Sequence, residues 1–266
     1  MSRSFTYTAL TLRVKASGES NREAWFLTAE EGVIRATVFG GPKSRLRARV
    51  APFHEGTLWI YHDPVRDTRK VSDFDVSSYR PGIRELYERS MAAGAVAETI
   101  LATHGGGGSW PLAARLAGSV LDALDGADAA ACSRMGIYFL WYWAQFIGVR
   151  PDLSASGGEV QGCPSCEFRR DCETLRDCEI PRDAVLWYSA GKETLLCEKY
   201  MERADSDSLI RVGPGARHWL KGIESIPPEA LTRVSLDAQS LEQARAFSKA
   251  VLAGALGKKL PTWDGI

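Results

Sequence analysis

The chain has no excess of charge of either sign, because 33 Lys and Arg residues balance 33 Asp and Glu residues. Overall charge therefore gives no hint of nucleic-acid binding, and any such hint must come from local distribution. Long apolar runs are also missing: the longest, Ile137 to Val149, contains Gln145 and is shorter than the roughly 20 residues of a membrane helix. The first residues, Met1 to Leu12, lack the apolar segment of a signal peptide. We expect a cytoplasmic protein without a membrane partner.

Catalytic features are equally scarce. The four histidines are scattered along the chain, and none stands beside a candidate nucleophile. Gly105 to Ser109 is a glycine-rich loop, but no Lys-Ser/Thr pair follows it and no strand precedes it, so it is not a phosphate loop. These absences predict a binding protein rather than an enzyme.

Cysteine is too infrequent for a disulfide scaffold, with six in 266 residues, yet five fall within one polar segment at about 160–200. Cys163 and Cys166 form a C-x2-C unit, which can present two thiolates to one metal ion. We therefore predict a metal site in this segment. Cys132 lies on an aromatic helix instead and is predicted to be a core residue. The candidate ligands are Cys163, Cys166, Cys172, Cys178 and Cys197.

Two metals are compatible with this cysteine segment. The spacing after Cys166 is irregular, with two gaps of five residues, and Cys197 lacks a C-x2-C partner because Tyr200 holds that position. We expect Zn²⁺. An iron–sulfur cluster is the alternative, because C-x2-C-x5-C also resembles the cluster loops of some DNA-processing nucleases and four thiolates suit both metals.

Short β-type runs fill residues 5 to 77, with turn signals between them and no predicted helix. Five or six closely spaced strands predict a small closed barrel of oligonucleotide-binding (OB) size. The predicted strands include Thr6 to Val14, Ala24 to Thr28, Val33 to Phe39, Leu58 to His62 and Val71 to Val76.

Within this block, residues 35 to 49 carry five basic residues and no acid. If Arg45 to Val50 is a strand, its three arginines alternate with apolar residues and share one face, where they could follow a phosphate backbone. A merely solvated strand face is the other reading. Aromatic residues for base stacking are available nearby in Phe39, Phe53, Trp59 and Tyr61. The candidate DNA-binding residues are Arg35, Lys43, Arg45, Arg47 and Arg49.

The pattern changes to helical spacing at Pro81, which predicts domains at 1–79 and 80–266. Ala184 to Ser189 and Thr194 to Cys197 form a predicted hairpin within the second domain. The expected helices cover Pro81 to Ile100, Pro111 to Leu124, Ala127 to Ile147, 205 to 222, 226 to 233 and Leu236 to Leu256. The third is so rich in aromatic residues that we place it at the centre of a bundle.

Several segments, taken in order, resemble one known family. They are Gly18-Glu19, Leu27 to Gly32, Gly40 to Arg45, Arg49 to Phe53, Tyr79 to Leu101 and Tyr138 to Leu153. Their order and spacing resemble RecO, the bacterial recombination mediators of DNA repair. The resemblance implies an α+β multidomain chain: an N-terminal OB-fold β-barrel that binds DNA, then an α-helical domain with an inserted Cys-rich zinc-finger-like segment. It implies binding of single- and double-stranded DNA, strand annealing and help in loading RecA onto coated DNA. The implied protein partners are single-stranded DNA-binding protein, RecR and, indirectly, RecA.

The resemblance also bears on the metal ligands. Cys163 and Cys166 match the family's first ligand pair, and Leu195-Leu196-Cys197 matches the approach to the second. Tyr200 stands where the fourth cysteine is usual. Two ligand sets stay open: Cys163, Cys166 and Cys197 with one inserted cysteine, or Cys163, Cys166, Cys172 and Cys178.

Two other functions compete with this reading. One is an iron–sulfur nuclease-associated DNA-processing subunit, which would show a visible absorption band and metal-dependent cleavage of DNA. The other is an adaptor whose barrel binds protein, which would show no salt-sensitive affinity for DNA.

Overall fold

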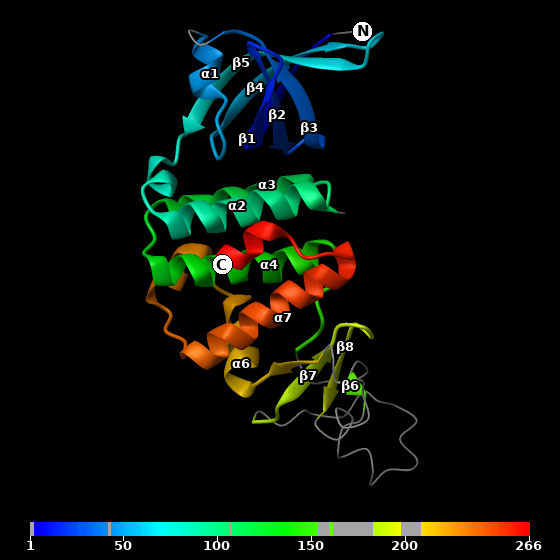
Figure 1. Ribbon diagram of the computed structural model, residues 1–266, viewed down its shortest axis with the longest axis vertical. Coiled ribbons are helices and arrows are strands. Elements are labelled where there is room, and N and C mark those ends of the chain that lie inside the picture. Colours follow the sequence, from blue (N-terminus) through cyan, green and yellow to red (C-terminus); the bar gives the residue numbers. More distant parts are fainter. Residues whose placement is uncertain (1–2, 42–43, 107, 154–159, 162–182, 198–208) are drawn as a thin grey trace.

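The computed structural model describes residues 3–41, 44–106, 108–153, 160–161, 183–197 and 209–266. A β-barrel, a body of helices and a small sheet follow one another along the long axis of the molecule (Figure 1). This order confirms a barrel followed by helices. The barrel ends at Ser78 and the first helical turn begins at Pro81; the division into domains at 1–79 and 80–266 remains a prediction.

Five strands form a closed barrel in the order β1-β2-β3-β5-β4, which agrees with the predicted OB fold. Every neighbouring pair is antiparallel except β3 and β5, which close the barrel in parallel at Thr37 and Lys70. Phe26 and Phe74 meet edge to face inside it, with ring centroids 6.0 Å apart. The strands are β1 Ser4–Ser17, β2 Asn21–Thr28, β3 Gly32–Val38, β4 Glu55–Asp63 and β5 Thr68–Ser78.

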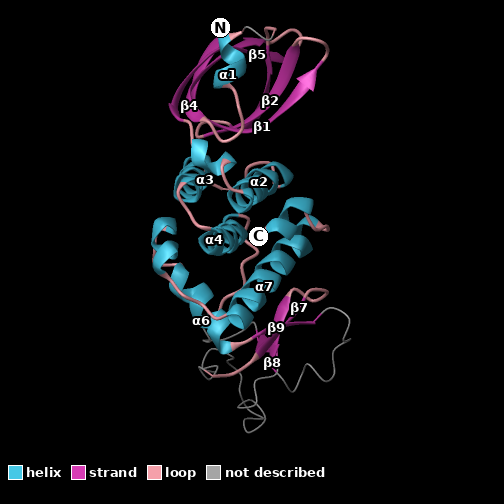
Figure 2. Cartoon of the chain, turned by 60° about the vertical axis from the view of Figure 1, so that its left-hand side comes forward, coloured by secondary structure: helices cyan, strands magenta, loops and turns pink. Residues whose placement is uncertain are grey.

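Helix α1 (Arg45–Arg49) lies between β3 and β4, so the prediction of a strand with three arginines on one face is wrong. The apolar residues of this segment fit period two, but Leu46 and Val50 are also four apart, which places both on one side of a helix. Val50 is fully buried in the barrel core and Leu46 packs against it. Helix α1 therefore closes the end of the barrel that points away from the other helices (Figure 2).

The helical body contains the predicted helices, with α4 at its centre. Phe139, Trp141 and Trp143 of α4 are fully buried, as the dense aromatic pattern predicts. Cys132 on the same helix is also buried, and burial raises the pKa of its thiol to about 11. The bounds are η1 Pro81–Arg84, α2 Tyr87–Ala102, α3 Trp110–Asp125, α4 Ala129–Phe146, α6 Pro214–Ile223, η5 Pro228–Arg233, α7 Ala238–Leu256 and η6 Pro261–Gly265.

A small sheet in the order β6-β8-β7-β9 lies at the far end of the molecule. Its antiparallel pair β7 (Leu186–Ser189) and β8 (Thr194–Cys197) is the predicted hairpin. Strand β6 (Val160–Gln161) was not expected, and strand β9 (Leu209–Val212) replaces the start of the helix predicted from 205.

The barrel and the helices share one continuous core, which includes Leu10, Leu12 and Leu27 of the barrel. The C-terminal turn η6 lies against α2, where Trp263 Nε1 donates to Thr99 Oγ1 at 2.9 Å. The barrel therefore sits directly on the helical body. Across the ranges that the structure describes, no helix combines the length and apolar character needed to cross a membrane.

Candidate nucleic-acid interface

A row of three side chains crosses the outer surface of the barrel on β1, β2 and β3. Trp25 on β2 lies opposite Arg13 on β1 and opposite Arg35 on β3. Residues directly opposite one another on neighbouring strands share a face of the sheet. Trp25 is thus an indole flanked by two guanidinium groups, and both arginines are exposed.

Local sequence explains why these residues point outward. Ala24 and Phe26 are buried in the barrel, so alternation turns Trp25 to the outside. Arg13 follows the buried Leu12, where a bulge in β1 shifts the register against β2. Two residues further on, Lys15 extends back so that its Nζ lies 5.8 Å from the centre of the Trp25 ring.

A second aromatic–cation pair lies where β3 meets β5. The Nζ of Lys70 is 5.3 Å from the centre of the Phe39 ring, and Phe39 is 45% exposed. Lys70 is the partner of Thr37, which is two residues beyond Arg35 on the outward side of β3. We call the outward-facing set the Trp25 face; it consists of Arg13, Lys15, Trp25, Arg35, Phe39 and Lys70.

Acidic side chains lie on the outer surface where β4 meets the C-terminal half of β5. Trp59 on β4 lies opposite Asp73 on β5, and the next outward residue along β5 is Asp75. Both carboxylates are exposed. Although the whole chain is neutral, the barrel therefore presents positive charge on one side and negative charge on another.

The predicted DNA-binding residues are divided between two places. Arg35 belongs to the Trp25 face, where its Nε lies 3.3 Å from Oε1 of Glu23. Arg45, Arg47 and Arg49 lie on α1, the short helix at the barrel end (Figure 2). Lys43 lies outside the described residues.

The α1 arginines differ in their surroundings. Arg49 Nη1 pairs with Asp73 Oδ1 at 3.1 Å and donates to the carbonyl of Phe74 at 3.3 Å. The main-chain carbonyl of Arg47 accepts from Arg22 Nη1 at 3.2 Å. Burial, and then the positive charge of Arg47, lower the pKa of Arg22. Arg22 and Arg47 thus concentrate positive charge at the barrel end, whereas the charge of Arg49 is partly balanced.

The predicted metal ligands fall almost entirely outside the described ranges. Cys163, Cys166, Cys172 and Cys178 lie there. Cys197 is the last residue of β8, where its backbone pairs with Leu186, and its side chain is outside the description. Within the described part of the chain, no group of three His, Cys, Asp or Glu side chains could hold a metal ion.

The Trp25 face has the chemistry of a single-strand binding surface. An indole or a phenyl ring can stack on an unpaired base, while arginine and lysine neutralise the flanking phosphates. The strand 2–3 face is also where OB barrels bind oligonucleotides.

Sequence reasoning found Arg35 and Phe39 but missed most of this face. The signal was present, because Arg13 and Lys15 alternate with Leu12 and Val14 in the first predicted strand. In the second predicted strand, Trp25 stands between Ala24 and Phe26, which both point inward. These positions were overlooked because the density of basic residues at 35–49 drew the prediction to one segment, whereas the face is assembled from four strands.

Comparison with known proteins supports the same assignment. A search of the curated proteins finds no match to this chain. Residues 1–79, which include the whole barrel, match the family described as recombination protein O N-terminal. The barrel is therefore an N-terminal domain of the RecO family of DNA recombination and repair proteins, and the predicted resemblance to that family is confirmed on this part of the chain.

Proposed function

We propose that this chain is a homologous-recombination mediator that binds single- and double-stranded DNA, anneals complementary strands and helps to load RecA onto coated single strands. The observation that carries the proposal is the row formed by Arg13, Trp25 and Arg35 on a barrel of the RecO family. Such a protein acts by binding, and we propose no bond chemistry.

The row favours a single strand as its first ligand. The face of an indole can stack only on a base that is splayed out of a duplex. Arg13 and Arg35 flank the indole on the neighbouring strands, so they can contact phosphates on either side of a stacked base. Double-stranded DNA would use only the charges, and we therefore expect it to bind more weakly at this face.

Annealing follows from the same charges. Two strands gathered on one protein repel each other less once lysine and arginine neutralise their phosphates. The family match supports single-stranded DNA-binding protein and RecR as direct partners and RecA as an indirect one. We propose that the protein works in the cytoplasm at the nucleoid.

We also propose that the Cys-rich segment holds one structural Zn²⁺. The C-x2-C unit at Cys163 and Cys166 supports this, as does the β7–β8 hairpin, which ends at Cys197. A structural zinc contributes folding energy to a segment with few apolar residues and supplies no reactivity.

Titration of a fluorescent single-stranded oligonucleotide at several salt concentrations tests the DNA-binding proposal. The logarithm of affinity should fall linearly with the logarithm of salt concentration, with a slope of about −0.7 for each phosphate contacted. Arg13→Ala should reduce that slope by about 0.7, and Arg35→Ala should reduce it by less, because Arg35 already pairs with Glu23. Asp75→Asn, on the acidic side of the barrel, is the control and should leave it unchanged. A protein with no salt-sensitive affinity would contradict the proposal.

A further inference from the structure

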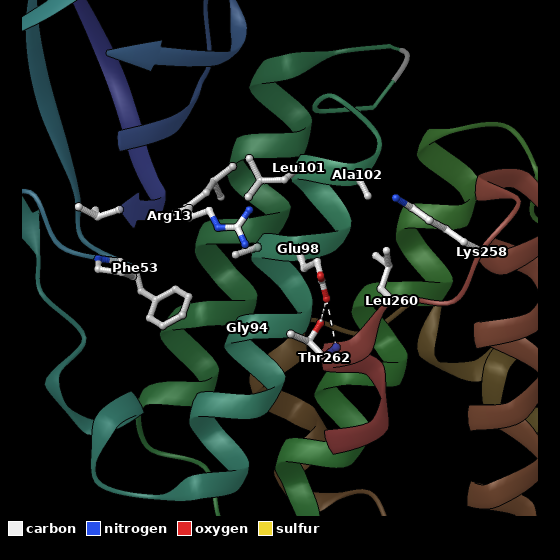
Figure 3. Close-up of a pocket in the computed structure, with 13 residues that line it drawn as sticks. Arg13, Phe53, Gly94, Glu98, Leu101, Ala102, Lys258, Leu260 and Thr262 are labelled. Atoms are coloured by element: carbon white, nitrogen blue, oxygen red, sulfur yellow. Dashed lines mark hydrogen bonds between the residues drawn. The ribbon is translucent and has the colours of Figure 1, made fainter. Parts of the chain in front are cut away.

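A groove of about 470 Å³ opens where the barrel meets α2 and the chain that follows α7 (Figure 3). Its volume lies within the range of about 300 to 1,000 Å³ in which small-molecule sites are found. The barrel contributes Arg13 and Phe53, α2 contributes Glu98 and Leu101, and the C-terminal segment contributes Lys258. It therefore joins an apolar floor to two cations and one carboxylate.

The groove continues the Trp25 face. Arg13 belongs to both, since it is opposite Trp25 in the barrel and lines the groove. Lys258 approaches from the other side, so the two cations flank the opening (Figure 3). A DNA single strand with one base stacked on Trp25 would reach this opening next if it continued across β1.

The loop that carries Phe53 is fixed in place. The backbone N–H of Phe53 donates to the carbonyl of Thr11 at 2.8 Å, and the carbonyl of Phe53 accepts from Arg80 Nη1 at 2.8 Å. The ring projects from the barrel toward α2 (Figure 3). Phe53 thus offers an aromatic surface inside the groove on which an unstacked base can lie.

Glu98 supplies a directional acceptor. The backbone N–H of Thr262 donates to its Oε2 at 3.1 Å, and the Thr262 hydroxyl donates to the same atom at 2.6 Å. Both bonds reach one oxygen, so Oε1 can accept from a ligand. Carboxylates pair in this way with the amino group of cytosine.

We propose that this groove is a subsite for one unstacked base of a bound DNA single strand, and that Glu98 selects a base with an exocyclic amino group. The inference rests on the proposed DNA binding by the Trp25 face. Phe53 contacts the base plane, Glu98 accepts from the amino group, and Arg13 and Lys258 bind the adjoining phosphates. Thymine carries a carbonyl oxygen where cytosine has its amino group, so it is disfavoured beside a carboxylate.

Two variants separate this subsite from the rest of the binding surface. In Glu98→Gln, the amide oxygen should keep the bonds from Thr262, because the backbone N–H can only donate. The amide NH₂ then faces the groove and favours thymine. In Gly94→Leu, the new side chain would enter the groove from α2; a Cβ there meets only Thr262 Cγ2, at 3.7 Å, an ordinary contact. Gly222→Leu, on α6 with nothing within 4 Å of its Cβ, is the matched control.

The experiment compares the affinities of dC and dT oligomers of equal length by fluorescence anisotropy. The natural protein should bind dC more tightly than dT, by about tenfold for one good contact of this kind. Glu98→Gln should reverse the order, Gly94→Leu should bring the ratio close to one, and Gly222→Leu should leave it unchanged. A ratio that neither Glu98→Gln nor Gly94→Leu alters overturns the subsite and leaves DNA binding by the Trp25 face intact. If the natural protein binds neither oligomer, the proposed function fails, and the subsite with it.

Discussion

Arg80 joins the barrel to the helical body through a single guanidinium group. Its Nε donates to Oδ1 of Asp122 on α3 at 2.6 Å, and its Nη2 donates to Oε2 of Glu55 on β4 at 2.5 Å. Its Nη1 donates a hydrogen bond to the Phe53 carbonyl. The side chain is only 2% exposed, and the backbone has a φ of 47°. This residue therefore fixes how the Trp25 face and the groove lie relative to the helices.

Replacing Arg80 should destabilise the whole chain. Arg80→Met leaves Glu55, Asp122 and the Phe53 carbonyl without their donor. The side chains of Glu55 and Asp122 are 28% and 60% exposed, so water can solvate them, and we expect a loss of about 1–3 kcal/mol in the free energy of unfolding. Arg80→Lys keeps the positive charge but cannot make the three hydrogen bonds of the guanidinium in their present directions, so we expect an intermediate loss of unfolding free energy. Urea unfolding measures both. Arg84→Met, on an exposed residue of the next turn, is the control. Equal stability of Arg80→Met and the natural protein would show that the joint does not depend on this pair.

Trp25 should contribute stacking energy, and its loss should be visible separately from the loss of charge. Trp25→Ala is expected to weaken single-strand binding about tenfold, because stacking contributes about 1–3 kcal/mol per base, and to leave the salt slope unchanged. Trp25→Phe should recover part of the affinity. Trp59→Ala is the matched control, since Trp59 lies on the acidic side beside Asp73. Equal losses for the two tryptophans would argue against a dedicated stacking face.

The three arginines of α1 should not behave alike. Arg45→Ala and Arg47→Ala should each flatten the salt slope for single strands by about 0.7 if these side chains contact phosphates. Arg49 already pairs with Asp73 and the Phe74 carbonyl, so Arg49→Ala should leave the slope nearly unchanged. The same salt titration measures all three. Unchanged slopes for Arg45→Ala and Arg47→Ala would confine DNA to the Trp25 face.

The strands were predictable because their signals are local. Alternation and turn residues set the barrel strands, and helical spacing with Pro81 set the start of the helices. The aromatic residues of α4 marked a buried helix correctly, as the burial of Trp141 and Trp143 shows. In each case the residues that form an element also carry the pattern that identifies it.

Helix α1 and the Trp25 face could not be read in this way. The apolar residues Leu46, Ala48 and Val50 fit both a strand and one turn of helix, and only burial of Leu46 and Val50 in the barrel decides between them. Trp25 meets Arg13 and Arg35 through strand pairing, and the bulge after Thr11 sets that register. Both the helical form of α1 and the alignment of the Trp25 face therefore depend on tertiary contacts, which no single segment of the sequence contains.

The Cys-rich segment should depend on its metal. If zinc folds it, Cys163→Ser should lower the melting temperature and the zinc content together, because the binding energy of a structural zinc is also folding energy. Elemental analysis with differential scanning calorimetry measures both. Cys132→Ala is a control for zinc content, since Cys132 is buried on α4. Iron with sulfide in place of zinc would favour the cluster alternative, and unchanged stability in Cys163→Ser would contradict the structural role.

His54 should make the barrel sensitive to mild acid. The residue is 4% exposed, its Nδ1 lies 2.8 Å from the carbonyl of Arg49, and its ring packs edge to face on Tyr79. Burial, followed by the charges of Arg84 and Arg80, lowers the pKa of His54 below its ordinary value of 6.5. The unfolded chain therefore takes up a proton at a higher pH than the folded chain does.

It follows that the free energy of unfolding falls as pH decreases below 6.5, until the folded form is protonated as well. His54→Asn keeps a donor near the Arg49 carbonyl but does not titrate, so it should reduce this dependence. Urea unfolding at a series of pH values between about 5 and 8, the range in which an ordinary histidine titrates, measures the slope. His218→Asn, on an exposed residue of α6, should retain the full slope. If His54→Asn lost stability with falling pH as steeply as the natural protein, the acid sensitivity would arise from other groups.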